Sequence, residues 1–336
     1  MKGLARKQAP FELNVQMIDF ISITKHIDKD RLYLGNCKQI CIYQDSGQAL
    51  YHLQGCERMK VFYNQHTGLL KVEGSLPYFL NGHNFSFSRE ELVQAVEFLD
   101  SMLGQVGLWG AIVEKFENGV IVPVDAKPKE YIARHYASAS SHLKKVHNDK
   151  YGGKFEMWQA KGEDIKLYDA GANLLMKQGK ARRDAIELAG WSPDLHYLKL
   201  EVRYTKPEAL NGSAPVLLEK LQNLNFINML KGNLMEQYHL LSPARALVLP
   251  SDKKNFTSLD AVLFTLADVL MNVQGLPLAE AKKQIYNTIN QADCLSKSDK
   301  DARKAQIRKA FGRLEEAPES KWDLTARLEE ALDKEI

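Results

Sequence analysis

Residues 197–204 read Tyr-Leu-Lys-Leu-Glu-Val-Arg-Tyr, with apolar residues at 198, 200 and 202 and charged residues at 199, 201 and 203. Neighbouring side chains of a β-strand point to opposite faces, so this alternation predicts a strand with one face in a core and one charged face. Similar runs recur in the first half, separated by short turns that favour antiparallel pairing. We expect strands at 15–24, 39–44, 59–63, 69–75, 109–116, 120–124, 154–160, 164–168 and 197–204.

Helices are predicted around and after these strands. Ser88 and Glu91 form a capping box before an apolar stripe, which predicts a helix that ends near Gly104. Further helical patterns cover 128–150, 172–188 and, beyond Pro215, most of the remaining chain. The sequence therefore predicts an α+β fold. It consists of an antiparallel-sheet domain flanked by helices at 11–206 and an all-helical C-terminal domain with a charged tail at 207–336.

Composition excludes several classes of protein. The chain has 336 residues, of which 45% are hydrophobic and 26% are charged, as in a globular protein of about two domains. It has no apolar run near the roughly 18 residues that a membrane span requires, so no membrane partner is expected. Residues 1–10 lack the layout of a secretory signal and the four cysteines make no disulfide framework, so we expect a cytoplasmic protein.

Charge is nearly balanced overall, with 45 basic and 42 acidic residues, but its distribution is uneven. Basic residues cluster at 127–150 and 177–183, where they either form one basic face or simply solvate two helices. Near the end, residues 300–313 include six basic and one acidic, whereas 315–335 include eight acidic and three basic. We interpret these last two segments as an exposed helical pair of opposite charge.

The sequence contains none of the common motifs of P-loop NTPases, Rossmann dehydrogenases, zincins or α/β-hydrolases. Other segments carry candidate chemistry. The strand at 69–75 presents Glu73, and the turn after it presents His83 and Asn84. A carboxylate and an imidazole on neighbouring backbone could share a hard cation; the alternative is a solvent-facing Glu and a His that caps backbone.

A second candidate is Tyr168, at the predicted junction of a strand with a basic helix. A phenol is a weak nucleophile at neutral pH, because its pKa is about 10, but nearby cations lower the barrier to its attack on a phosphate. Glu201 and Arg203 share one face of their strand, and Glu114 lies on another. These three are either site residues or members of cross-strand salt bridges.

Taken in order, four elements resemble the replication initiators of filamentous phages and the related rolling-circle plasmid initiators. They are the Met-Ile-Asp run at 17–19, the strand and Gly-His-Asn turn at 71–84, Leu-Tyr-Asp at 167–169, and Leu-Glu-Val-Arg at 200–203. The resemblance covers roughly 17–206, and the Gly-His-Asn turn is its most specific part. The chain departs from the wider class in lacking a His-hydrophobic-His pair, and from the family in having Glu114 where Asp is frequent and Ala170 where Lys often follows.

The resemblance implies an endonuclease that nicks one strand of duplex origin DNA through a 5′-phosphotyrosine intermediate and later rejoins the strand. Tyr168 matches the family's nucleophile by position. A divalent ion, Mg²⁺ or Mn²⁺, is also implied. Its candidate ligands are Glu73, His83, Glu114 and Glu201, and the candidate DNA-binding residues are Lys166, Lys177, Arg182, Arg183, Arg203 and Asn84.

The partners that the resemblance implies are duplex origin DNA and single-stranded DNA. A host helicase is a further partner by analogy, because the chain lacks a phosphate-binding loop for unwinding DNA itself. Two alternatives remain open. One is a tyrosine relaxase or transposase of a mobile element, and the other is a DNA-binding replication control protein without catalysis.

Overall fold

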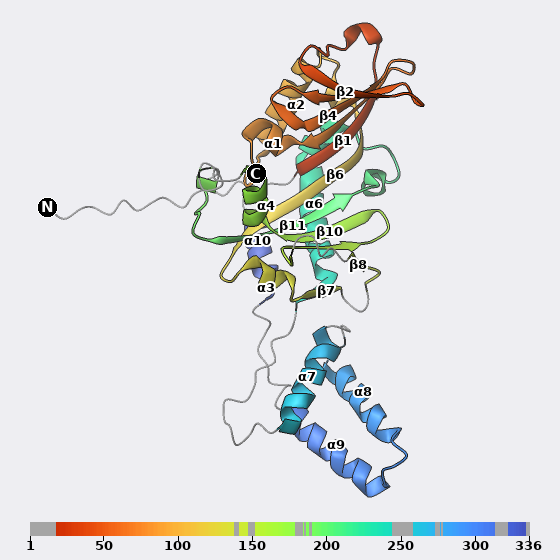
Figure 1. Cartoon of the computed structure of the whole chain (residues 1–336), viewed down its shortest axis with the longest axis vertical. Coiled ribbons are helices and arrows are strands. Elements are labelled where there is room, and N and C mark those ends of the chain that lie inside the picture. Colours follow the sequence, from red (N-terminus) through yellow and green to blue (C-terminus); the bar gives the residue numbers. More distant parts are fainter. Residues whose placement is uncertain are drawn as a thin grey trace, which may run out of the picture.

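The computed structural model describes residues 18–137, 141–146, 152–178, 184, 186–187, 190–243, 258–272, 276, 278–312 and 322–333. Within these residues, ten strands form one antiparallel sheet in the order β2-β3-β4-β5-β1-β6-β11-β10-β9-β8 (Figure 1). A short second sheet pairs β12 with β7. The strands are β1 Ile18–His26, β2 Cys37–Tyr43, β3 Gln48–Leu53, β4 Cys56–Asn64, β5 Leu69–Ser75, β6 Ile112–Val124, β7 His135–Ala137, β8 Lys144–Val146, β9 Phe155–Gln159, β10 Glu163–Asp169, β11 His196–Tyr204 and β12 Leu241–Pro243.

Helices cover both faces of the large sheet. The apolar face packs against α2, α6 and α10, whose buried side chains share one core with residues such as Ile21, Val72 and Leu200. The opposite face is polar at its centre and is covered in part by α4 and the turn after α1. The α+β fold predicted from the sequence is confirmed. The helices are α1 Leu76–Asn81, α2 Arg89–Met102, α3 Pro128–Ile132, α4 Ala170–Gln178, α6 Leu224–His239, α7 Ser258–Asn272, α8 Leu278–Asn290, α9 Lys297–Gly312 and α10 Thr325–Asp333.

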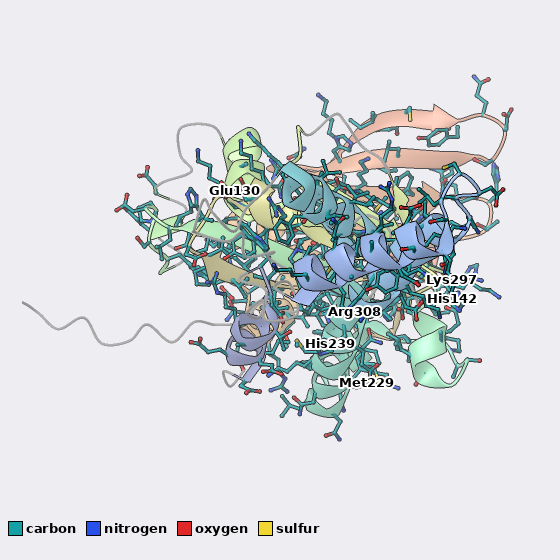
Figure 2. The ribbon with its side chains drawn as sticks, turned by 90° about the horizontal axis from the view of Figure 1, so that it is seen from below. Glu130, His142, Met229, His239, Lys297 and Arg308 are labelled. Atoms are coloured by element: carbon teal, nitrogen blue, oxygen red, sulfur yellow. The ribbon has the colours of Figure 1, made fainter. Side chains whose placement is uncertain are left out.

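A separate hydrophobic core lies between α7, α8 and α9, with Phe264, Ile285 and Phe311 among its members. Lys297 and Arg308 lie along α9 in the view of Figure 2. In contrast, α6 and α10 belong to the core of the sheet. The two cores therefore do not divide the chain at residue 206, where the sequence suggested a boundary, because the apolar stripes of α6 and α10 are buried against β6 and β11.

Three predictions of secondary structure need correction. β3 was not predicted from the sequence. In the structure its residues alternate between half-buried and buried, as expected for a strand with one face in a core. β6 is one 13-residue strand, not two, because the expected Glu-Asn-Gly turn lies inside the sheet. There Asn118 is fully buried and donates a hydrogen bond to the Leu230 carbonyl. The stretch 128–150 is helical only in α3 and continues into β7 and β8, while 138–140 and 147–150 lie outside the described residues.

Two helix predictions can be compared with the described residues. The capping box before α2 is confirmed: the Ser88 hydroxyl accepts from the Glu91 amide and the Glu91 carboxylate accepts from the Ser88 amide. The helical pattern expected beyond Pro215 is interrupted at Asn223, whose side chain caps α6 by accepting from two backbone amides. None of the helices in the described part of the chain is long and apolar enough to cross a membrane.

Candidate functional site

The centre of the sheet carries a cluster of charged side chains on its polar face. Antiparallel pairing sets Tyr168 opposite Lys199, and Lys166 opposite Glu201, on β10 and β11. On the other side of β11, Glu201 is opposite Gly119 of β6 and Arg203 is opposite Glu117. Since alternate residues of a strand share a face, the register places all these side chains on one side of the sheet. We call Asp19, Glu117, Lys166, Tyr168, Lys199, Glu201 and Arg203 the central network.

Glu201 is the hub of the central network. Its Oε2 accepts a hydrogen bond from the Tyr168 hydroxyl at 3.0 Å and lies 3.3 Å from Lys199 Nζ. Its Oε1 lies 2.6 Å from Lys166 Nζ. The Tyr168 phenol is thus held against a carboxylate that two ammonium groups also contact.

Asp19 anchors one end of the network. Its Oδ2 lies 2.5 Å from Lys199 Nζ and accepts from the Asn84 amide at 2.7 Å, while its Oδ1 accepts from the Ser75 hydroxyl at 2.5 Å. Asn84 reaches this position because α1 ends at Gly82 with a left-handed φ of 73°, which glycine adopts without steric cost. The Gly-His-Asn turn therefore orients a buried carboxylate.

Glu117 links the other end. Its Oε1 contacts Lys166 Nζ at 2.5 Å and Arg203 Nη2 at 2.5 Å. The Arg203 side chain is 35% exposed, whereas those of Lys166 and Glu117 are 7% and 9% exposed. The network therefore meets solvent at Arg203 and is buried elsewhere.

The network contains three carboxylates and three cations, and burial alone would be costly for each of them. Burial would raise the pKa of Glu201, but Lys166 and Lys199 hold that pKa well below its usual value. Burial would likewise lower the pKa of Lys199, but Asp19 and Glu201 raise it. Both groups are therefore charged at neutral pH.

The pKa values of Tyr168 and Glu117 are both raised, which favours their neutral forms. Burial and the Glu201 charge raise the pKa of Tyr168 well above its usual value of 10, so the phenol is neutral. The same two causes raise the pKa of Glu117 to about 7, against the opposing effect of Lys166 and Arg203. The charge of Glu201 acts directly on the pKa of Glu117, so the two carboxyl groups titrate as a pair that binds a proton near neutral pH.

Gly119 makes the central contact between Lys199 and Asp19 sterically feasible. A Cβ atom on this residue would lie 3.1 Å from Lys199 Cε and 2.8 Å from the Leu200 carbonyl oxygen. The lysine side chain therefore occupies space that any other residue at 119 would fill. This explains why glycine sits inside a long strand, where it otherwise weakens the sheet.

An apolar cluster covers one side of the central network. Phe85 contacts Tyr197 edge to face at 5.4 Å between ring centroids, and Leu174 of α4 is fully buried in the same cluster. Tyr168 itself is 8% exposed, and its ring centroid lies 6.3 Å from that of Phe155. Most of the phenol is therefore separated from solvent.

The four candidate metal ligands are dispersed. Glu73 accepts from the Ser22 hydroxyl at 3.0 Å and pairs with Lys71 at 2.6 Å, while Glu114 accepts from the Thr24 hydroxyl at 2.8 Å. His83 is buried in the turn, where its Nδ1 accepts from a backbone amide. Over the residues that the structure describes, no three His, Cys, Asp or Glu side chains gather into a metal site. In the described part of the chain these four residues therefore do not form one metal site, and the divalent ion that the resemblance implies stays a prediction.

The candidate DNA-binding residues occupy different environments. Lys166 and Asn84 are buried and already hold carboxylates, and Arg203 lies at the solvent edge of the network. The side chain of Lys177, with Arg182 and Arg183, lies outside the described residues. Asp19, Glu117 and Lys199 were not identified from the sequence as members of the network. Lys199 could have been found, because it lies on the same face of its strand as Glu201 and Arg203.

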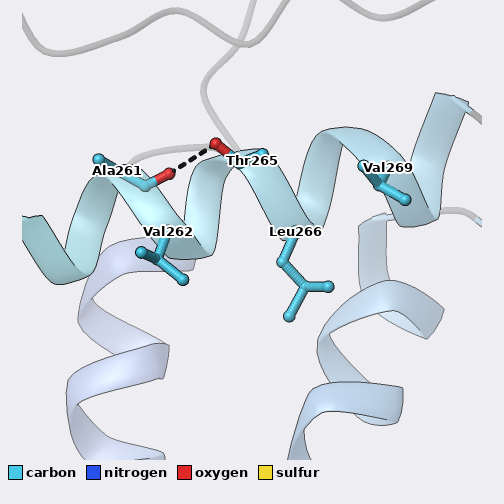
Figure 3. A pocket seen from close by; sticks show the side chains of 5 residues that line it. All are labelled: Ala261, Val262, Thr265, Leu266 and Val269. Atoms are coloured by element: carbon cyan, nitrogen blue, oxygen red, sulfur yellow. Dashed lines mark hydrogen bonds between the residues drawn. The ribbon is translucent and has the colours of Figure 1, made fainter.

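A shallow groove of about 430 Å³ lies on α7, far in sequence from this network (Figure 3). It is lined by Ala261, Val262, Thr265, Leu266 and Val269. Among the described residues, no titratable side chain lines this groove, so these residues offer no acid, base or nucleophile for catalysis.

The comparisons with known proteins include a distant similarity to a solved structure. No protein-family model and no curated protein matches the chain. Among solved structures, the chain is similar to a rolling-circle replication initiator protein from Geobacillus stearothermophilus, with a TM-score of 0.37 and 11% sequence identity. The alignment covers 72% of this chain and 92% of that one.

Proposed function

We propose that this protein is a rolling-circle DNA replication initiator that nicks and rejoins one DNA strand through Tyr168. The observation that carries this proposal is the hydrogen bond from the Tyr168 hydroxyl to Glu201, beside Lys166 and Lys199. It combines a nucleophile, a proton acceptor and two cations within one site.

The residues suggest how the step proceeds. The Tyr168 oxygen forms a bond to the phosphorus, and its proton passes to the Glu201–Glu117 pair, which binds a proton near neutral pH. The bond from phosphorus to the 3′ oxygen breaks, and the leaving oxygen takes a proton from solvent water to become a free 3′-hydroxyl. The product is a DNA 5′-phosphate joined to Tyr168, and the reverse reaction rejoins the strand.

Cations stabilise the negative charge that develops on the phosphate oxygens in such a transfer. Lys199 and Lys166 flank the phenol, and Arg203 lies where the network meets solvent. We place the entering DNA backbone at Arg203, and we propose that DNA binding opens access to the buried Tyr168 phenol. The divalent ion remains a prediction, tested by adding EDTA to the assay below.

The non-catalytic alternative draws on one observation, the burial of a neutral Tyr168 phenol. Such a protein would bind replication-origin DNA without cleaving it. A relaxase or transposase would share the Tyr168 chemistry and differ in the DNA that it recognises.

The test is incubation of the protein with supercoiled plasmid that carries its own replication region, with Mg²⁺ or Mn²⁺, followed by denaturing electrophoresis. We expect nicked DNA with protein attached to the 5′ end at Tyr168. Tyr168→Phe should abolish the adduct and retain DNA binding. Tyr204→Phe is the matched control, because Tyr204 is also buried and hydrogen-bonded, to Asn233, on the other face of the sheet. Binding without nicking by the unmodified protein under either metal would support the non-catalytic alternative.

A further inference from the structure

The α7–α9 unit has a feature that the proposed chemistry at Tyr168 does not use. Its third helix, α9, is anchored by Ile307, Ala310 and Phe311, which are buried against α7 and α8. The rest of α9 is mostly exposed. The helix is therefore held by one narrow apolar edge and presents the remainder of its surface to solvent.

The exposed surface of α9 is basic. The helix contains six basic and two acidic residues. One of the acids, Asp299, is used at the helix start, where its carboxylate accepts from the Ser296 amide and hydroxyl. Lys300 donates to the Asn290 carbonyl at 2.8 Å and is also used within the unit.

Five cations of α9 remain, and within the described residues none of them forms a salt bridge. Four are exposed and Lys304 is half-buried. By the helical rise of 1.5 Å per residue, the span from Lys297 to Arg308 is roughly 16 Å (Figure 2). We call Lys297, Arg303, Lys304, Arg308 and Lys309 the α9 basic surface.

The residues between these cations favour a close approach. Ala302, Ala305 and Gln306 are exposed, and all three are small or uncharged. No large apolar side chain of α9 is exposed, so this helix lacks the apolar face with which an interfacial helix enters a lipid surface. A basic helix with small side chains can instead approach a phosphate backbone closely.

The acidic helix α10 packs against the sheet. Leu328 and Leu332 of α10 are buried in the core of the sheet. Arg327 of the same helix lies 3.3 Å from Asp125 and donates to the Tyr131 hydroxyl at 3.0 Å. The helix that bears Glu329 and Glu330 is therefore docked on the sheet by its apolar face, and within the described residues neither of these carboxylates pairs with α9.

We propose that the α9 basic surface binds the backbone of duplex DNA, with α9 lying in or along the major groove. An α-helix is about 10–12 Å in diameter and fits the major groove of B-form DNA, which is about 12 Å wide, whereas the major groove of A-form RNA is too narrow. The choice of DNA rests on the proposed function. In this arrangement α9 holds the duplex origin, and the central network acts on one strand of it.

The test uses the full chain and a fluorescent duplex of the protein's own replication region, with affinity measured over a series of salt concentrations. The variant is R308E/K309E, which changes two exposed side chains outside the core. The matched control is K38E/K129E, which makes the same change in net charge at two exposed residues far from α9 in the sequence. We expect the α9 variant to lose at least about tenfold in affinity and the control to lose much less.

The salt dependence of the affinity provides a second test of the proposal. Each phosphate contact contributes about 0.9 to the slope of log affinity against log salt, so losing two contacts should reduce the slope by about 2. A gain-of-function variant, Ala305→Arg, should tighten binding, which a folding defect would not do. Equal affinities for the α9 variant and the control, or no tightening by Ala305→Arg, would overturn the proposal.

The nicking assay separates this proposal from the proposed function. The α9 variant should still cleave a single-stranded oligonucleotide of the origin, because the central network is intact. Tyr168→Phe should bind the duplex normally and cleave nothing. If the unmodified protein binds duplex through α9 but never cleaves DNA, the proposed function fails and the α9 proposal stands.

Discussion

The ammonium group of Lys199 lies 2.5 Å from the Asp19 carboxylate, although the two residues are 180 positions apart in the chain. Both side chains are buried, at 0% and 6% exposed. The pair spans β6, which lies between β1 and β11 in the sheet, and crosses it above Gly119. One ion pair therefore joins β1 to β11, the strand that bears Glu201.

Removing Lys199 should be strongly destabilising. Lys199→Met leaves Asp19 and Glu201 buried without one of their cations, and breaking a buried pair in this way costs about 3–5 kcal/mol. The double variant D19N/K199M should recover part of that loss, because the orphaned Asp19 charge is removed as well. Urea unfolding of the two single variants and the double variant measures the coupling. A cost below about 1 kcal/mol for Lys199→Met would contradict the arrangement.

Gly119 should not tolerate a methyl group. Gly119→Ala places Cβ against the Leu200 carbonyl and Lys199 Cε, so we expect lower stability and displacement of Lys199. Gly232→Ala is the matched control, since a Cβ there meets no atom within 4 Å and the residue lies inside α6. The control should gain about 0.5–1 kcal/mol from helix propensity. Thermal unfolding of both variants tests whether Gly119→Ala lowers the stability while Gly232→Ala raises it.

Glu117 should make stability fall as pH rises through neutrality. Its folded-state pKa, about 7, exceeds the ordinary value of 4.5, so the stability that it contributes is complete below pH 4.5 and lost as pH rises through about 7. By linkage the loss is on the order of 3 kcal/mol. Glu117→Gln, which cannot ionise, should reduce the difference in unfolding free energy between pH 5 and pH 8. An unchanged difference would show that Glu117 does not titrate in this range.

We expect Asn84 to contribute to stability mainly through its hydrogen bond to the Asp19 carboxylate. Asn84→Ala removes the amide that donates to Asp19 and leaves the carboxylate with Ser75 and Lys199. We expect a loss of about 1.5–3 kcal/mol in the free energy of unfolding, as for other hydrogen bonds to charged groups. The side chain of Asn81, which donates to Glu91 on the surface side of α1, provides a comparison. Asn81→Ala should cost less, because Glu91 retains its capping bond to Ser88.

Sequence patterns predicted the elements whose signals are local. The capping box of α2 and the alternation of β5 and β11 depend on residues within one turn or one strand, so the chain itself carries them. Gly119 inside β6 was predicted to lie in a turn, because glycine usually marks turns. In the structure it lies in the strand, where the Lys199 side chain from the neighbouring strand occupies the space above it. The stretch after Pro128 was read as helix, yet pairing with β9 and β12 makes part of it strand.

The sequence by itself determined that Glu201, Lys199 and Arg203 share one face of a strand, because side-chain alternation is a property of the extended backbone. It also singled out Tyr168 and the Gly-His-Asn turn. Only the tertiary structure decided that Asp19 and Glu117 join Glu201 while Glu73 and Glu114 stay apart. The reason is physical: register shifts where β1 pairs with β6 decide which carboxylates reach the buried lysines, and such irregularities arise only when the strands pair.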